Sequence, residues 1–126
     1  MPITVGQPFA ASETGGRANN EDAIYPAIGQ AARGTGALFV VCDGVGGAER
    51  GEVASALACE ALADGMAATG ERDVQGAVKY TERRFDEYLA AHPEAVGMAT
   101  TLTMLAFDRG GGVTVAHIGD SRVYQF

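Results

Sequence analysis

Residues 40–47 read Val-Val-Cys-Asp-Gly-Val-Gly-Gly, and this stretch decides the fold. An apolar run over residues 37–42 stops abruptly at the carboxylate of Asp43, and a glycine-rich loop follows. The run predicts a buried strand from Leu38 to Cys42 that ends at Asp43 and Gly44. Because an Asp-Gly pair by itself is only a turn signal, the meaning of this strand end depends on what accompanies it.

Two helices are expected after the glycine-rich loop. The first has an apolar stripe at helical spacing, formed by Val53, Leu57, Ala61 and Met66. The second runs from about Asp73 to Ala91, with Asp73 as its N-terminal cap and Pro93 just beyond its end.

Strands are expected on both sides of the two helices. The segments concerned are residues 9–14 and 23–28 before the helices, and 100–107, 113–118 and 121–126 after them. Pro26 favours an edge position for the second of these strands. The order of strands, two helices and strands predicts an α+β fold with an antiparallel sheet rather than a parallel βαβ fold.

The composition restricts the class of protein. The 126 residues suffice for one domain, and 47% are hydrophobic, which allows a packed core. The net charge of −7 argues against a nucleic-acid surface. Neither a signal pattern nor a membrane-length apolar run is present, so a soluble, cytoplasmic protein is expected. Cys42 and Cys59 are then expected to be reduced core thiols.

Three turns that carry carboxylates follow one design. Glu21 and Asp22 stand where a loop becomes a strand, Asp43 ends the buried strand, and Asp120 follows the strand over residues 113–118. Mg²⁺ and Mn²⁺ prefer oxygen ligands, so carboxylates that converge from several strand ends suit these ions. Arg17 could offer its planar fork to phosphate oxygens. Taken singly, each of these segments reads first as an ordinary polar turn, and Arg17 as a solvated surface residue.

Four segments occur together in a fixed order. They are residues 17–23 (Arg-Ala-Asn-Asn-Glu-Asp-Ala), 41–47 (Val-Cys-Asp-Gly-Val-Gly-Gly), 97–102 (Gly-Met-Ala-Thr-Thr-Leu) and 117–124 (His-Ile-Gly-Asp-Ser-Arg-Val-Tyr). This combination resembles the amino-terminal half of the metal-dependent protein phosphatases, the protein phosphatase 2C family, in its bacterial form. The resemblance covers the chain from about Phe9 onward.

The resemblance implies an α-β-β-α sandwich of two antiparallel sheets with helices outside. Residues 1–126 would be the amino-terminal portion of a single catalytic domain. The implied activity is hydrolysis of phosphoserine and phosphothreonine in proteins through a metal-bridged water. Substrates would then be phosphoproteins made by a Ser/Thr kinase, with neither nucleic acid nor membrane as a partner.

The resemblance also assigns roles to individual residues. Asp43 would bridge two metal ions, and the Gly44 carbonyl would bind one of them. Glu21 and Asp22 would hold metal-bound waters, and Asp120 would help to bind a further ion. The complete domain would therefore hold two or three Mn²⁺ or Mg²⁺ ions.

Other positions bear on substrate binding and on completeness. By the same resemblance, Arg17 would bind the substrate phosphate. Val45 stands where one group of the family has a histidine, so the leaving-group proton must come from water or elsewhere. Two further metal-binding aspartates of the family belong to a second half that this chain lacks. The fragment alone is thus expected to be nearly inactive, with strand edges that favour self-association.

Two alternatives stay open at this stage. A catalytically inactive phosphatase-like module used for partner binding would fit the short chain. A phosphate-binding or nucleotide-binding domain that uses the glycine-rich loop is less well supported, because Arg17 is the one cation placed to complement it.

Overall fold

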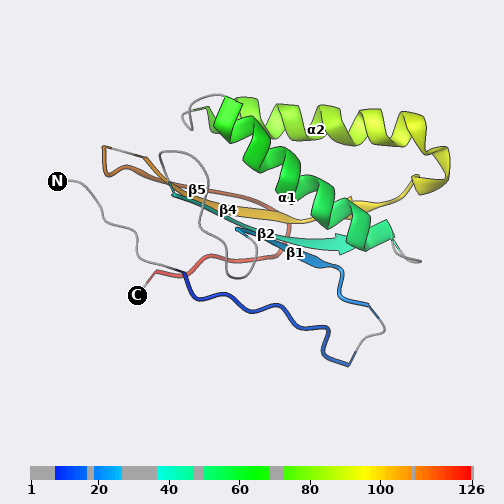
Figure 1. Cartoon of the computed structure of the whole chain (residues 1–126), viewed down its shortest axis with the longest axis horizontal. Coiled ribbons are helices and arrows are strands. Elements are labelled where there is room, and N and C mark those ends of the chain that lie inside the picture. The colour runs from blue at the N-terminus through cyan, green and yellow to red at the C-terminus, as the bar shows by residue number, and fades with distance from the viewer. Residues whose placement is uncertain are drawn as a thin grey trace.

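One antiparallel sheet carries two helices on one of its faces (Figure 1). The computed structural model describes residues 8–16, 19–26, 37–46, 50–68, 73–108 and 110–125. The strands are β1 (Asp22–Tyr25), β2 (Ala37–Val45), β3 (Ala99–Thr100), β4 (Leu102–Phe107) and β5 (Val113–Ile118). The helices are α1 (Arg50–Ala68) and α2 (Val74–Ala91), followed by a short 3₁₀ turn, η1 (Pro93–Ala95). The predicted α+β class with an antiparallel sheet is confirmed.

The strands are ordered β1-β2-β4-β5, and β3 pairs with the far end of β2. The central pair is β2 and β4, in a register that places Val40 opposite Met104. The hairpin of β4 and β5 is confirmed, and the amide of Gly112 closes it by donating to the Asp108 carboxylate at 2.8 Å. Strand β1 lies at one edge of the described sheet, as Pro26 indicated.

Strand β2 shows which face of the sheet is covered. Leu38, Val40 and Cys42 are buried, whereas the residues between them are more exposed, because successive side chains of a strand point to opposite faces. The buried side chains of β2 pack with those of α1 and of the neighbouring strand β4 in the main core. Its members include Leu38, Val40, Cys42, Ala58, Cys59, Leu62, Met66, Leu102, Met104 and Ala106.

Helix α1 is buried more broadly than its predicted stripe. Val53 and Leu57 pack only at the side, in a smaller cluster with Ala54 and Met98. The fully buried positions are mostly small residues, since α1 lies between the sheet and α2 and small side chains allow close approach. Of the predicted stripe, Ala61 and Met66 are therefore buried, whereas Val53 and Leu57 mark one flank of α1.

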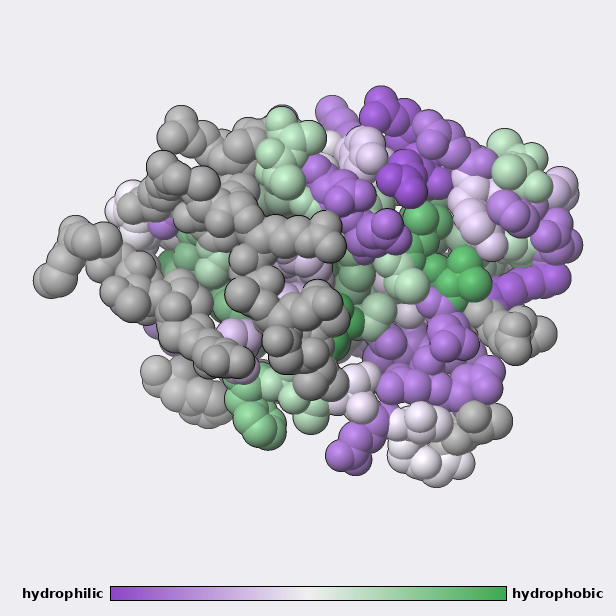
Figure 2. Space-filling view, in the orientation of Figure 1, coloured by the Kyte–Doolittle hydropathy of each residue, from purple (hydrophilic) through white to green (hydrophobic). Residues whose placement is uncertain are grey.

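Helix α2 agrees with its prediction. It begins after Asp73, whose carboxylate accepts a hydrogen bond of 2.8 Å from the Gly76 amide, and it ends two residues before Pro93. Its outer face gathers hydrophilic side chains (Figure 2). Within the described residues, neither helix is long and apolar enough to span a membrane.

Two of the predicted strands are absent from the part of the chain that the structure describes, so those predictions were wrong. Residues 9–14 and 121–125 adopt no strand conformation, because neither segment forms a backbone ladder with a neighbour in the described chain. Phe9 is 97% exposed, so the first of these segments does not bury its aromatic side chain against the sheet. Both segments run on the side of the sheet away from the helices (Figure 1). Residues 27–28 and 126 lie outside the described residues.

Candidate metal centre

Strand β2 does not end at Asp43, contrary to the prediction. It continues through Gly44 and Val45 because these residues pair with Thr100 and Ala99 of β3. The Gly44 amide donates to the carbonyl of Glu21 at 3.0 Å, which fixes the loop before β1 to the same place. Asp43 is therefore held inside a hydrogen-bonded ladder rather than in a turn.

Gly44 is required by the approach of helix α1. A Cβ atom at this position would overlap the carbonyl oxygen of Gly51 and would lie 3.0 Å from the carbonyl oxygen of Glu21. Gly51 is equally confined, because a Cβ there would lie 2.8 Å from Cδ of Glu21. The first turn of α1, the Asp43-Gly44 pair and the Glu21 side chain thus meet without space for another carbon atom.

Asp22 and Asp43 are direct cross-strand partners in β1 and β2. Opposed residues of an antiparallel pair hold their Cβ atoms about 5 Å apart, so the two carboxylates share one region of the sheet. Alternation along β2 places Asp43 on the same face as Val41, away from the helices. This pairing concentrates negative charge at one end of the sheet.

The loop that presents Glu21 and Asp22 has its own anchors. The side-chain oxygen of Asn20 accepts from the Asp22 amide at 3.0 Å, a local turn that suits Asn. The amide nitrogen of the same side chain donates to Ser12 Oγ at 2.9 Å. The segment before β1 is therefore tied to the residues that begin the strand.

These residues surround a polar cavity of about 170 Å³. Its lining consists of Glu13, Thr14, Asn19, Asn20, Glu21, Asp22 and Asp43. The structure thus brings together three of the carboxylates considered above, Glu21, Asp22 and Asp43. Glu13 and Thr14 were not anticipated, since no motif indicated that residues 8–16 would lie beside β1.

Asp120 does not line this cavity. It is exposed, in the turn after β5, and Gly119 before it has a φ of 104°. The register of β2 with β4, continued by two pairs, places Thr101 opposite Asp43, and that of β4 with β5, continued by one pair, places Gly119 opposite Thr101. Two strand spacings, about 10 Å, therefore separate the backbones of Asp43 and Gly119. Arg17 lies outside the described residues.

The donor chemistry of the cavity fits a hard divalent cation, because its charged groups are carboxylates and its neutral groups are amides and a hydroxyl. The part of the chain that the structure describes contains no group of three acidic, histidine or cysteine side chains arranged as a metal site. Carboxylates that bind Mg²⁺ or Mn²⁺ need not form a complete cage, since these ions keep several waters.

Cys42, next to Asp43, is a buried and inert thiol. A hydrogen bond with Cys59 and burial both raise the pKa of its side chain. Both cysteines are buried and free of disulfides, as the sequence predicted. The residue on the helix side of the candidate metal centre is therefore an uncharged core group.

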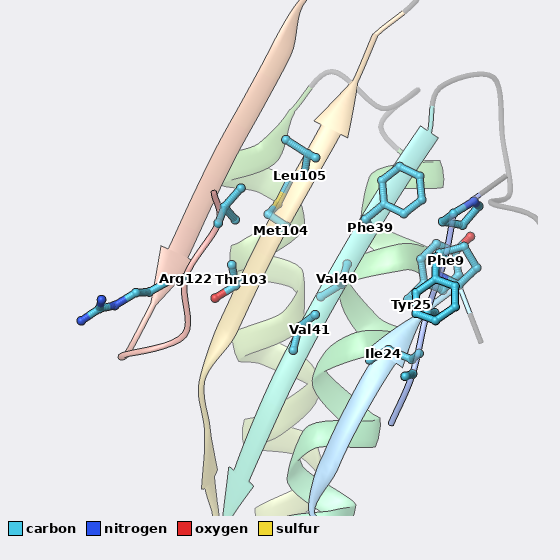
Figure 3. A pocket seen from close by; sticks show the side chains of 15 residues that line it. Phe9, Ile24, Tyr25, Phe39, Val40, Val41, Thr103, Met104, Leu105 and Arg122 are labelled. Atoms are coloured by element: carbon cyan, nitrogen blue, oxygen red, sulfur yellow. The ribbon is translucent and has the colours of Figure 1, made fainter. Parts of the chain in front are cut away.

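A second cavity, of about 340 Å³, lies on the sheet face away from the helices (Figure 3). Side chains of Ile24, Phe39, Val41 and Leu105 line it, with Thr103 and Arg122 towards one side (Figure 3). The Thr103 hydroxyl is buried and has no hydrogen-bond partner among the described residues. This face is apolar, in contrast to the acidic cavity at the end of the same sheet.

Fold and site together define an antiparallel α+β unit with an acidic cavity suited to a hard cation. Comparison with known families identifies the class of protein. The family model described as protein phosphatase 2C matches residues 11–126. The chain belongs to the protein phosphatase 2C family.

The matching relatives are Ser/Thr protein phosphatases. The chain is 35% identical over 128 residues to the serine/threonine protein phosphatase PstP of Mycobacterium tuberculosis, in strain H37Rv and in strain CDC 1551. The match covers 97% of this chain and 23% of PstP, so the chain spans about a quarter of the curated relatives' length.

Solved structures agree with this relationship. The crystal structure of M. tuberculosis PstP matches with a TM-score of 0.66 and 36% identity, over 84% of this chain and 43% of that one. The catalytic domain of PstP in complex with two manganese ions matches with a TM-score of 0.64 and 34% identity, over 84% and 44%. The chain therefore corresponds to part of that catalytic domain.

Proposed function

We propose that the full-length protein hydrolyses phosphoserine and phosphothreonine in proteins, in a reaction that depends on Mn²⁺ or Mg²⁺. The observation that carries the proposal is the opposition of Asp22 and Asp43 at an acidic cavity, in a chain of the protein phosphatase 2C family. Two carboxylates held side by side repel each other unless a cation lies between or near them. A manganese-bound structure of PstP supports the same choice of cofactor.

The metal ligands that we assign are those that the family resemblance implies, and three of them, Glu21, Asp22 and Asp43, line the acidic cavity. Asp43 and the Gly44 carbonyl would bind the ions directly, and Glu21 and Asp22 would hold waters of their coordination shells. Asp120 is assigned to a further ion, outside the cavity that the other residues line. Bound divalent cations lower the pKa of a coordinated water and stabilise the charge that develops on phosphate oxygens.

The chain's own groups would orient the substrate and the ions. Arg17 is assigned to the substrate phosphate, where its planar guanidinium can bind two oxygens at once. Gly44 and Gly51 allow helix α1 to pack closely against the ligand-bearing strand, because a Cβ atom at either position would crowd neighbouring atoms. Val45 is 62% exposed, and its aliphatic side chain has no acidic proton to donate. The leaving alkoxide would therefore be protonated by water or by a group elsewhere.

Residues 1–126 would form the amino-terminal portion of one catalytic domain. The chain spans 43% of the solved PstP chain, so we expect negligible turnover from the 126-residue chain alone. The exposed faces of its edge strand β5, with Val115 and Ile118 each about half exposed, would favour self-association of that fragment. Sedimentation velocity at rising concentration measures this association directly.

The proposed activity is tested with phosphopeptides. Full-length protein, freed of metal by chelation, is incubated with a phosphothreonine peptide and with the same peptide carrying phosphotyrosine. We expect phosphate release from the phosphothreonine peptide only, after Mn²⁺ or Mg²⁺ is restored. Equal release with and without metal, or a preference for phosphotyrosine, would overturn the proposal. Robust turnover by the 126-residue chain would overturn its assignment as an incomplete site.

A second candidate is an inactive phosphatase-like module that binds a partner. It is favoured by one observation, that the described residues include no three-ligand metal group. A calorimetric titration of the full-length protein with Mn²⁺ separates the candidates. Saturable binding supports the enzyme, whereas absence of binding supports the module.

A further inference from the structure

Thr101 occupies an unusual position between β3 and β4, directly opposite Asp43. Its amide donates to the Asp43 carbonyl at 2.9 Å, as in an ordinary antiparallel ladder. The return bond is different, because the Asp43 amide donates to the side-chain oxygen Oγ1 of Thr101 at 3.0 Å. A hydroxyl has therefore replaced a backbone carbonyl as the acceptor.

The displaced carbonyl has another partner. The hydroxyl of Thr100 donates to the carbonyl of Thr101 at 2.8 Å, so this carbonyl is satisfied by its neighbour. The ladder is thus interrupted at one residue without loss of hydrogen bonding. Both main-chain groups of Asp43 depend on Thr101, one on its backbone and one on its side chain.

The same hydroxyl also contacts the turn that carries Asp120. Thr101 Oγ1 and Ser121 Oγ lie 3.1 Å apart and share a hydrogen bond. Gly119 lies so close that a Cβ there would be 2.6 Å from Cγ2 of Thr101. Its φ of 104° also requires glycine. The turn over residues 119–121 is therefore packed on Thr101.

We propose that Thr101 is a positioning residue that holds the backbone of Asp43 and the Asp120 turn in a fixed relation. A threonine hydroxyl has two lone pairs and one proton, so it can accept from the Asp43 amide and still pair with Ser121. The backbones that carry the two carboxylates are then linked through the Thr101 side chain and the Ser121 hydroxyl that pairs with it. The inference rests on the proposed function, because the ions that this relation would serve are assigned there.

The test compares three variants of the full-length protein. Thr101→Val removes the hydroxyl at nearly constant volume, Thr101→Ser retains it, and Thr103→Val is the matched control. Thr103 lies two residues further along the chain, in β4, is 4% exposed, and has a hydroxyl without a partner among the described residues. Loss of that hydroxyl therefore removes no observed hydrogen bond.

Two readouts are needed. The first is the Mn²⁺ dissociation constant by calorimetry, and the second is hydrogen exchange of the Asp43 amide by NMR without metal. Thr101→Val is expected to weaken Mn²⁺ binding about 10-fold or more, the usual effect of losing a residue that orients a ligand. Its Asp43 amide should exchange about 10-fold faster. Thr101→Ser should retain most of the Mn²⁺ affinity and most of the protection of the Asp43 amide. Thr103→Val should change neither.

Ser121→Ala addresses the second half of the proposal and remains informative if Thr101→Val does not fold. It should speed exchange at Gly119 and Asp120 while the Asp43 amide stays protected. Wild-type Mn²⁺ affinity and Asp43 protection in folded Thr101→Val would overturn the proposal, as would unchanged exchange at residues 119–120 in Ser121→Ala. If the wild type binds no Mn²⁺, the proposed function fails, whereas the exchange readout still decides the positioning role.

Discussion

Asp22 and Asp43 face each other across β1 and β2 in direct register. Like charges in this relation destabilise a sheet, so the protein without metal carries a built-in repulsion at its acidic cavity. Asp43→Asn should therefore raise the free energy of unfolding of the metal-free chain, by up to about 1 kcal/mol. Urea denaturation in the presence of a chelator measures the change.

The control for charge is Asp86→Asn, which removes one carboxylate from the exposed face of α2. It should shift the unfolding free energy by less than about 0.5 kcal/mol. Mn²⁺ should stabilise the wild type and the Asp86 variant but leave the Asp43 variant unchanged, because a ligand stabilises only a state that binds it. A metal-free Asp43→Asn variant less stable than the wild type would contradict the repulsion.

Gly44→Ala should destabilise the chain strongly. The added carbon would overlap the Gly51 carbonyl, and both neighbours are backbone atoms that cannot rotate away. Forced overpacking of this kind costs about 1–3 kcal/mol or more, visible as a lower urea midpoint. Gly16→Ala is the matched control, since nothing lies within 4 Å of its Cβ position. Equal stability of the two alanine variants would show that α1 is not packed on β2 as described.

Cys42 should resist thiol reagents in the folded chain. The hydrogen bond with Cys59 and burial raise the pKa of its thiol above the ordinary 9.0, and its side chain is 0% exposed. Alkylation by iodoacetamide at pH 8 should therefore occur only after addition of denaturant. Rapid labelling of Cys42 in the native chain, detected by mass spectrometry, would contradict its burial.

The same pKa shift makes stability depend on pH. Above about pH 9 the unfolded thiol loses its proton while the native thiol keeps it, so the native state binds more protons. The unfolding free energy must then fall as the pH rises, by at most about 1.4 kcal/mol per pH unit for this group. Cys42→Ala should be less stable at pH 7 and show a smaller slope above pH 9. An unchanged slope would be evidence against the raised pKa.

The N-terminus of α2 offers a test of local helix stability. The Asp73 carboxylate accepts from the Gly76 amide, so Asp73→Ala should cost about 1 kcal/mol of unfolding free energy. Asp73→Asn retains an acceptor oxygen and should lose much less. Thermal unfolding followed by circular dichroism compares the two. A loss in Asp73→Asn as large as that in Asp73→Ala would indicate that charge, rather than the hydrogen bond, stabilises this end.

Much of the fold could be predicted from local patterns. Strand β2, helix α2 with its Asp73 cap and the hairpin of β4 and β5 all follow from periodicity and turn residues that act over a few positions. The boundary of β2 could not be predicted, because Gly44 and Val45 become strand only through pairing with β3, more than fifty residues away. The prediction of a strand over residues 9–14 was wrong for the converse reason, since a short segment without a neighbouring ladder remains irregular.

The residues of the candidate site could likewise be predicted only in part. Glu21, Asp22 and Asp43 could be selected from the sequence because carboxylates beside strand ends and glycines are visible there. The contribution of Glu13 to the cavity and of Thr101 to the Asp43 backbone could not be, because both depend on tertiary contacts of ordinary residue types. Gly51 likewise reads as a helical glycine, and only the packing shows that Glu21 and Gly44 require it.

We propose that Asp43 organises a metal-dependent phosphatase site in the full-length protein. Its most direct test is the rate of p-nitrophenyl phosphate hydrolysis by full-length wild type and Asp43→Ala, each with saturating Mn²⁺ and after chelation. We predict metal-dependent turnover in the wild type and its loss in the variant, with the variant's fold intact by circular dichroism. Metal-dependent turnover retained in Asp43→Ala would contradict the account.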